Sequence, residues 1–390
     1  MDASVFAKML SDKSITDLKK LSYKYPGIDM SEFIALLKAG TYKALPLLDF
    51  HGENLVYMGN VTQIRMSAIK LLLASRSKEA FGMNAMEDEI SSTLTIESID
   101  FSRDSVRKIM SGYAPSDESE NRIYGLKKGL EFIADSANTI TEDNIHRLYE
   151  ISIEPYLSEG DKLLPGAFYR HDNVYIVGQD LEHTGLPHGK LPEYIQALAA
   201  FINAESKLDD LCKAAVIHFY IAYLHPWFDG NGRMARLIHM WYLRQKGWPS
   251  AMFVPFSSYI ERNRKAYYNA YTLCEDNARI SRIMDVTPFL EYFITNVYNK
   301  LEDSLPKPDT TEAFQAALNS GKITEKESEL WSFVLSAYGA NEFSTKQLER
   351  DFGNAAYATI RSFVLKFSEL HLLHSQKYGN RVKYRIFDTD

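Results

Sequence analysis

The stretch His225–Arg236, HPWFDGNGRMAR, decides how the rest of this chain is interpreted. The residues before it, Leu211–Leu224, are apolar on nearly every side, which predicts a buried helix. Pro226 predicts that this helix ends at His225, because proline cannot continue a helix and restricts the residue before it. The imidazole is therefore expected at the end of a helix, pointing into the loop that follows.

The loop itself has the composition of an anion-binding turn. Gly230, Asn231 and Gly232 can adopt positive φ angles at low cost, so that their amide N–H groups converge on an anion. Arg233 is expected to open a second helix that runs to about Lys246. The positive end of that helix would favour the same anion.

Charged side chains around the turn fit a phosphate held together with a metal ion. Arg233 and Arg236 are three residues apart, so they share a helical face and can both reach phosphate oxygens. Asp229 would repel a phosphate unless a cation lay between them, and one carboxylate with phosphate oxygens is a usual way to hold Mg²⁺. The residues thus predict a site for a Mg²⁺-nucleotide or another polyphosphate, with His225 as general base near the reacting phosphorus.

The pattern HPxxDGNGRxxR fixes roughly eight positions, which is too many for coincidence at average composition. It resembles the signature of the Fic family, HPFx[DE]GNGRxxR, with Trp227 where the family usually has Phe. The resemblance covers about residues 85–300. It implies a mainly α-helical Fic-type bundle with a β-hairpin flap, and an enzyme that transfers AMP from ATP to a Ser, Thr or Tyr hydroxyl of a protein, the enzyme itself included. Such an enzyme is a protein adenylyltransferase, or AMPylator.

A helix expected over about residues 85–98 ends in the letters STLTIES. Thr93 and Glu97 are four residues apart on one face of it, and taken alone they fit an ordinary solvated helix end. Beside the signature they resemble the family's inhibitory motif [ST]xxxE[GN], with Ser98 in place of Gly or Asn. The resemblance implies autoinhibition: Glu97 pairs with Arg236, takes the place of a terminal phosphate and repels it.

Residues 162–178, KLLPGAFYRHDNVYIVG, change character and predict a β-hairpin. Its strand-like runs are Phe168–Arg170 and Val174–Val177. By the resemblance this hairpin is the flap that covers the nucleotide and docks the target's backbone as an added strand; the alternative is an ordinary surface hairpin. The docking residues implied are Phe168, Tyr169, Arg170, Val174, Tyr175 and Ile176.

Residues 257–268 resemble the family's helix that ends in NRxxYY, where a Tyr contacts the adenine side of the nucleotide. Tyr268 is the candidate for that contact, because an aromatic ring stacks on any purine. Tyr267 or Tyr268 is expected to be a core residue instead. Together the motif and the resemblance imply a nucleotide site formed by Gly230, Asn231, Gly232, Arg233, Arg236 and Tyr268.

Three parts of the chain are expected. Residues 1–115 would form an N-terminal helical region, with one helix near Asn60–Ala80 and the inhibitory helix after it. Residues 116–303 would form the catalytic core, an all-α bundle whose one hairpin is the flap. SLPKPDTT, residues 304–311, is a proline-containing hinge, and residues 312–390 would form a separate C-terminal domain.

The C-terminal domain has the element order of a winged helix-turn-helix. Three helices are expected near residues 325–337, 345–352 and 355–373, followed by a hairpin that carries Lys377, Arg381, Lys383 and Arg385. From Glu325 to Asp390 there are nine Lys and Arg and nine Asp and Glu, so the domain is close to neutral. DNA, a protein partner and a second copy of the chain all remain open as its ligand.

Composition bounds the class of protein. The chain has 390 residues, 45% of them hydrophobic and 24% charged, as is usual for a soluble globular protein. A net charge of −7 excludes a general affinity for nucleic acid. Two cysteines, Cys212 and Cys274, are too few for a disulfide framework. No signal peptide and no apolar run of membrane-spanning length is recognisable, so a cytoplasmic location without a membrane partner is expected.

Two other functions remain open from the sequence. One is a nucleotide-sensing transcriptional regulator that binds DNA through its C-terminal domain. The other is an enzyme that removes AMP from a modified protein, with Glu97 orienting a water molecule.

Overall fold

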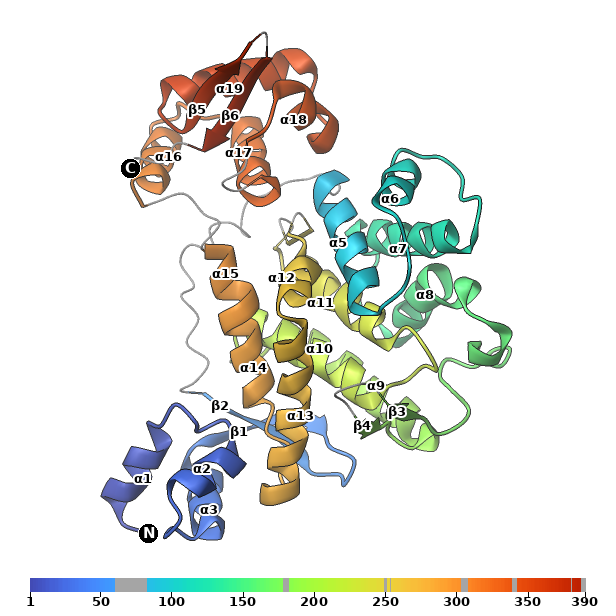
Figure 1. Cartoon of the computed structure of the whole chain (residues 1–390), viewed down its shortest axis with the longest axis vertical. Coiled ribbons are helices and arrows are strands. Elements are labelled where there is room, and N and C mark those ends of the chain that lie inside the picture. Colours follow the sequence, from blue (N-terminus) through green and yellow to red (C-terminus); the bar gives the residue numbers. More distant parts are fainter. Residues whose placement is uncertain are drawn as a thin grey trace.

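The computed structural model describes residues 1–59, 83–177, 182–248, 251–252, 254–302, 308–338, 342–379 and 381–386. The helix expected near Asn60–Ala80 lies outside them. Within these ranges the chain is mainly α-helical and contains three two-stranded antiparallel sheets (Figure 1). None of the helices in the described ranges combines the length and the apolar character needed to cross a bilayer.

The N-terminal lobe consists of three short helices and a hairpin. The helices are α1 (Ala3–Leu10), α2 (Leu18–Lys24) and α3 (Met30–Gly40), and the strands are β1 (Tyr42–Leu48) and β2 (Asn54–Met58). The helices expected in this part of the chain are present, whereas the β1–β2 hairpin was not predicted. Gly52 turns the chain with φ +85°, and the Asp49 carboxylate accepts hydrogen bonds from the His51 and Glu53 amides at 2.8 and 2.9 Å.

The central bundle is organised around the antiparallel helix pair α10 (Asp210–Leu224) and α11 (Asn231–Gln245). Nearly every residue of α10 is buried, as its apolar sequence predicts. The helices around this pair are α5 (Met83–Ile96), α6 (Arg103–Met110), α7 (Glu118–Ala134), α8 (Glu142–Ser152), α9 (Leu191–Asn203), α12 (Phe256–Arg262), α13 (Arg264–Ser281), α14 (Thr287–Phe293) and α15 (Asn299–Glu302).

Short elements connect the bundle. Three 3₁₀ turns lie at Glu154–Tyr156, Glu159–Asp161 and His188–Lys190, and a π-helical turn, Ile294–Tyr298, joins α14 to α15. The flap hairpin consists of β3 (Tyr175–Val177) and β4 (Glu182–Thr184).

The C-terminal residues form a domain with a hydrophobic core of its own. It contains α16 (Pro308–Asn319), α17 (Glu325–Ala337), α18 (Thr345–Phe352), α19 (Tyr357–Glu369), β5 (Leu373–Tyr378) and β6 (Arg381–Ile386). Gly353, with φ +73°, makes the turn between α18 and α19. Residues 308–311, which were expected to belong to the hinge, form the beginning of α16.

This domain contacts the central bundle through α18, which packs against α5. In Figure 1, α17 and α18 lie on the side of the domain nearer the bundle, and the β5–β6 hairpin lies at the outer end. The helix α5, which carries Thr93, therefore contacts both the central bundle and the C-terminal domain.

Candidate functional site

His225 ends α10 as its sequence predicts. It adopts a left-handed conformation with φ +53°, and its amide donates to the Ile221 carbonyl at 3.1 Å. Pro226 follows directly and prevents a further helical turn. A left-handed non-glycine residue is uncommon and costs free energy, so the surrounding structure must hold it there.

The turn after Trp227 is held by the side chain of Asn231. The Asn231 side chain accepts from the Trp227 amide at 3.0 Å and donates to the Trp227 carbonyl at 2.8 Å. Gly230 alone of the three expected turn residues has a positive φ, +86°, and α11 begins at Asn231 rather than at Arg233. The expected concavity of three left-handed residues is thus replaced by the first turn of a helix, whose free amides also attract anions.

Gly232 stands where another residue would meet the inhibitory segment. A Cβ atom at Gly232 would lie 2.3 Å from Oε1 of Glu97 and 3.3 Å from Nη1 of Arg236. The Glu97 carboxylate therefore lies against the first turn of α11, at the place where the helix N-terminus favours a negative charge.

Arg236 is the buried cation of the site, with 3% of its surface exposed. Its Nε donates to the Thr93 hydroxyl at 2.5 Å, and its Nη2 donates to Oε1 of Glu97. Burial lowers the pKa of the guanidinium, but the charge and hydrogen bond of Glu97 together with Tyr267 and Tyr268 outweigh it, and the pKa of Arg236 lies above its ordinary value. The expected pairing of Glu97 with Arg236 is therefore present, and Thr93 adds a hydrogen bond that was not predicted.

Two guanidinium nitrogens next to this pair have no acceptor. Arg233 Nε and Arg236 Nη1 are buried and make no hydrogen bond within the described part of the chain. Arg233 uses Nη2 to pair with Asp229 at 2.7 Å, and half of the Asp229 side chain remains exposed. Buried donors without acceptors are rare and costly, so they indicate a site that a ligand completes.

The contacts that attach α5 to the bundle were not predicted from the sequence. Glu89 is buried and accepts from the Ser257 amide at 2.9 Å and from the Ser257 hydroxyl. The Ser92 and Ser258 hydroxyls are 2.9 Å apart and share a hydrogen bond. Burial raises the pKa of Glu89. The spacing of Glu89 with Thr93 and Glu97, four residues each, is the signal that could have placed all three on one face.

The end of α5 aims Glu97 at Arg236 through a left-handed residue. Ser98 has φ +56°, and two backbone hydrogen bonds close the turn, from Ile99 to the Leu94 carbonyl at 3.0 Å and from Ser98 to the Thr95 carbonyl at 3.1 Å. This is the pattern of a Schellman motif, whose left-handed position is usually glycine. Gly and Asn adopt such a left-handed conformation at lower cost than serine.

The structure corrects the expected flap. Phe168–Arg170 is not a strand, because the Phe168 carbonyl accepts from the Trp227 indole at 3.1 Å and the Arg170 amide donates to the Pro226 carbonyl at 3.0 Å. These residues are tied to the motif loop instead. The hairpin pairs Tyr175 with Thr184, so the first strand of the prediction does not exist.

Two of the predicted docking residues point inward. Tyr169 is buried and donates its hydroxyl to Glu142 at 2.6 Å. Arg170 is 2% exposed and donates to the carbonyls of His225 at 2.7 Å, of Asp172 at 2.6 Å and of Leu186. Arg170 thus supports the left-handed backbone of His225. Val174 and Tyr175 remain near or on the surface, and the side chain of Ile176 lies outside the described residues.

Tyr268 lies beside the end of α5, but on a different helix from the one expected. The predicted single helix is broken, since α12 ends at Arg262 and α13 begins at Arg264, so Tyr268 belongs to the beginning of α13. Its hydroxyl donates to the Ile96 carbonyl at 3.3 Å. Tyr267 is the core residue of the pair, buried and hydrogen-bonded to His218 at 2.8 Å.

Known proteins resemble the central region of the chain. Residues 139–243 match the model of the Fic/DOC family. Curated relatives named protein adenylyltransferase Fic include those of Drosophila willistoni, 27% identical, and Drosophila ananassae, 26% identical, each over 177 residues, 45% of this chain and 32% of the relative. The chain thus spans 32% of the length of these relatives.

Solved structures give similar neighbours. A Fic family protein from Desulfovibrio desulfuricans is 19% identical, with a TM-score of 0.47 over 79% of this chain and 87% of the other. Fic-1 from C. elegans is 18% identical, with a TM-score of 0.41 over 77% of this chain and 72% of the other.

We expect the Schellman turn at Ser98 to set the local stability of α5. Ser98→Gly should strengthen amide hydrogen-exchange protection at the end of α5 by about 0.5–1 kcal/mol relative to Ser98→Ala, because glycine removes the left-handed cost. Both variants lose the hydrogen bond that the Ser98 hydroxyl accepts from Arg264 at 2.9 Å, so the difference isolates the backbone. Equal protection in the two variants would contradict the strained turn.

Proposed function

We propose that this chain, whose residues 139–243 form a Fic/DOC family domain, transfers AMP from ATP to a Ser, Thr or Tyr hydroxyl of a protein. The observation that supports this most directly is the pair of buried donors without acceptors, Arg233 Nε and Arg236 Nη1, near the beginning of α11. Phosphate oxygens supply the acceptors that these nitrogens lack, and the helix N-terminus favours their charge.

The proposed reaction is an in-line displacement at the α-phosphorus of ATP. His225 accepts the proton of the target hydroxyl, whose oxygen forms a bond to the α-phosphorus while the bond to the pyrophosphate oxygen breaks. Pyrophosphate leaves with the electron pair of that bond. The amides of Asn231 and Gly232 and the guanidinium of Arg236 stabilise charge on the leaving phosphates. Tyr268 contacts the base in this proposal.

Asp229 is the residue we propose to hold Mg²⁺. Its carboxylate is half exposed, and among the described residues no group of three or more His, Cys, Asp or Glu side chains could hold a metal, so phosphate oxygens would complete the coordination. A bound Mg²⁺ neutralises phosphate charge and orients the leaving group. Asp229 also pairs with Arg233, which keeps the carboxylate at the mouth of the turn.

Glu97 supports the proposal that the chain is autoinhibited. Its carboxylate accepts from Nη2 of Arg236 and lies against Gly232, where we propose that a phosphate binds. A triphosphate can therefore reach Arg236 productively only after Glu97 moves away.

Removing the Glu97 side chain should activate the enzyme. With labelled ATP and Mg²⁺, Glu97→Gly is expected to raise self-modification by at least about tenfold over wild type, the factor that corresponds to one charge-assisted contact. Thr95→Gly is the matched control, because it places the same flexible residue in the last turn of α5 without touching Arg236. His225→Ala in the Glu97→Gly background should abolish transfer. Equal rates for wild type and Glu97→Gly would remove the autoinhibition proposal.

The role of Asp229 is tested by metal titration. In the Glu97→Gly background, Asp229→Ala should raise the Mg²⁺ concentration that gives half-maximal transfer, because a neutral side chain cannot share the ion with the phosphates. Asp172→Ala, a carboxylate on the nearby loop, serves as the control. An unchanged Mg²⁺ dependence would show that Asp229 does not hold the metal.

A second candidate function is DNA binding by the C-terminal domain. Although the chain is acidic, residues 342–386 carry eight Lys and Arg against four Asp and Glu. Five exposed cations lie on α19 and the wing, namely Arg361, Lys377, Arg381, Lys383 and Arg385, and Lys346 and Arg350 of α18 are exposed as well. A helix in the major groove with a basic wing on the backbone is the docking geometry of this fold.

We test this second function with a random-sequence DNA duplex and the full-length chain. Arg361→Glu/Arg381→Glu should weaken binding by at least about tenfold and flatten its dependence on salt, because two phosphate contacts are lost. Lys19→Glu/Lys20→Glu makes the same change of net charge on α2 and should leave the affinity unchanged. No binding by wild type, or equal loss in both variants, would exclude a DNA site on this surface.

A further inference from the structure

Arg170 is a buried cation that binds backbone carbonyls. Only 2% of its surface is exposed, and within the described ranges its side chain donates to the carbonyls of His225 at 2.7 Å, of Asp172 at 2.6 Å and of Leu186. Burial lowers the pKa of the guanidinium, and the Asp172 charge offsets part of this effect. A buried charge is costly unless it is hydrogen-bonded, so these three contacts hold the guanidinium in place, and the guanidinium holds the three carbonyls together.

The three carbonyls come from three segments that meet at the end of α10. His225 is the C-cap of α10, whereas Asp172 precedes β3 and Leu186 follows β4. Leu186 also donates its amide to the Leu224 carbonyl at 3.2 Å. Arg170 therefore links both ends of the β3–β4 hairpin to the residue that we propose as the general base.

The contact with His225 involves a residue whose backbone is strained. His225 has φ +53° and ψ +61°, a left-handed conformation that a residue with a side chain adopts at a cost in free energy. The hydrogen bond from Nε of Arg170 fixes the carbonyl of this same residue and so opposes rotation about ψ. A guanidinium presents its donors in one plane, so it specifies the orientation of the carbonyl as well as its charge.

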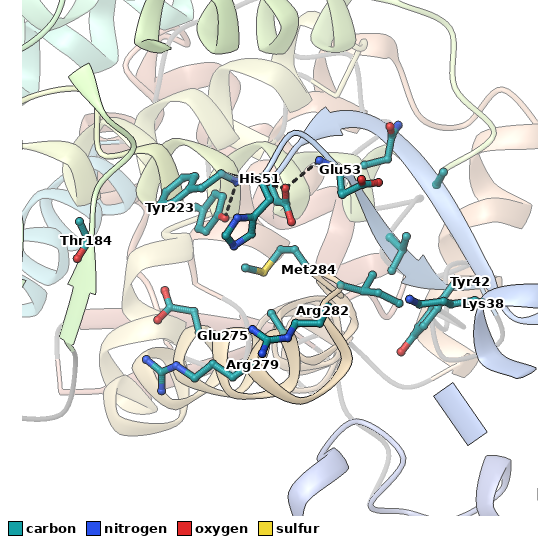
Figure 2. Close-up of a pocket in the computed structure, with 17 residues that line it drawn as sticks. Lys38, Tyr42, His51, Glu53, Thr184, Tyr223, Glu275, Arg279, Arg282 and Met284 are labelled. Atoms are coloured by element: carbon teal, nitrogen blue, oxygen red, sulfur yellow. Dashed lines mark hydrogen bonds between the residues drawn. The ribbon is translucent and has the colours of Figure 1, made fainter. Parts of the chain in front are cut away.

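Gly185 allows the guanidinium and His225 to come this close. A Cβ atom at Gly185 would lie 2.8 Å from Nη2 of Arg170 and 3.3 Å from Cβ of His225. Thr184, the preceding residue, lines instead the cavity of about 1010 Å³ between the β1–β2 hairpin and the end of α13 (Figure 2), whose described walls include neither Arg170 nor His225. The close packing around the guanidinium is therefore separate from this cavity.

We propose that Arg170 is a positioning residue for the transfer: by binding the His225 carbonyl, it holds His225 in the left-handed conformation from which the imidazole reaches the target hydroxyl. Without this contact the backbone would relax toward a right-handed conformation, which turns the Cα–Cβ bond and the imidazole with it. The inference rests on the proposed AMP transfer and adds a residue that acts through the general base. The alternative is that Arg170 only stabilises the fold, as a cation at the C-terminal end of a helix does.

The test measures AMP transfer by full-length Glu97→Gly protein that also carries Arg170→Met. The rate of self-modification at saturating Mg²⁺-ATP is expected to fall by about a hundredfold, the scale for a misplaced catalytic group, while the half-saturating ATP concentration changes by less than about twofold. The two quantities separate because, in the proposed mechanism, the beginning of α11 and not Arg170 holds the phosphates.

Arg170→Lys in the same background separates charge from geometry. A lysine keeps the positive charge near the end of α10 but lacks the planar set of donors. We expect its melting temperature to lie closer to that of the Glu97→Gly parent than the melting temperature of Arg170→Met does, while its saturating rate remains as low as that of Arg170→Met.

Lys213→Met is the matched control for loss of a buried cation. Lys213 is buried and likewise donates to backbone carbonyls, those of Ile202 at 3.2 Å and Ala204 at 2.7 Å, but it lies at the beginning of α10. Its loss should lower the melting temperature without lowering the saturating rate of the folded protein.

Gly185→Ala tests the same contact without removing the charge. The added methyl group displaces the guanidinium from His225, so the saturating rate should fall by at least about tenfold at an unchanged half-saturating ATP concentration. Gly189→Ala is its control, because a Cβ atom there would meet no atom within 4 Å, and it should leave the rate unchanged.

The outcomes separate this inference from the function on which it rests. A saturating rate unchanged in Arg170→Met and Gly185→Ala, a rate restored by Arg170→Lys, or an equal loss of rate in Lys213→Met would overturn the positioning role and leave AMP transfer standing. Absence of transfer by the Glu97→Gly parent would overturn the proposed function, and the positioning role with it.

Discussion

The structure depends on the buried guanidinium of Arg236, which Glu97 neutralises here and which a phosphate would neutralise in the proposed reaction. Arg236 lies inside the bundle at 3% exposure, and a guanidinium there must be paired, since an unpaired buried charge is strongly destabilising. In the described structure Glu97 and Thr93 satisfy part of it, and one nitrogen is left without an acceptor. We propose that a phosphate, which can also reach the remaining nitrogen, replaces Glu97 when the site is occupied. The same pairing that stabilises the fold thus blocks the proposed reaction.

We propose that access of nucleotide to the site is controlled by how firmly α5 is attached to the elements around it. Glu89 binds the beginning of α12 and Tyr268 binds the last turn of α5. The C-terminal domain packs on the same helix through α18. These contacts involve parts of the chain far apart in sequence, so an event at any of them changes the free energy of moving Glu97.

Structural features that depend on residues close in sequence were predicted from local patterns. Pro226 fixed the end of α10, and the spacing of Thr93 and Glu97 placed both on the face that meets Arg236. The resemblance to the Fic signature supplied the partner. What failed depended on long-range contacts: Phe168 and Arg170 have strand-like neighbours, yet hydrogen bonds to the motif loop hold them out of the sheet. Glu89 and Ser257 are 168 residues apart, so no local pattern relates them. The β1–β2 hairpin was not predicted, because it follows directly on the amphipathic runs that form α1, α2 and α3.

The central claim is that Glu97 and a phosphate compete for the guanidinium of Arg236. Titration calorimetry of Mg²⁺ with a non-hydrolysable ATP analogue, on wild type and on Glu97→Ala, measures that competition directly. The account predicts that the variant binds the analogue at least about tenfold more tightly, because the phosphates no longer displace a charge-assisted ion pair. Equal affinity in the two proteins would mean that nucleotide binds without contacting Arg236, which would contradict the account.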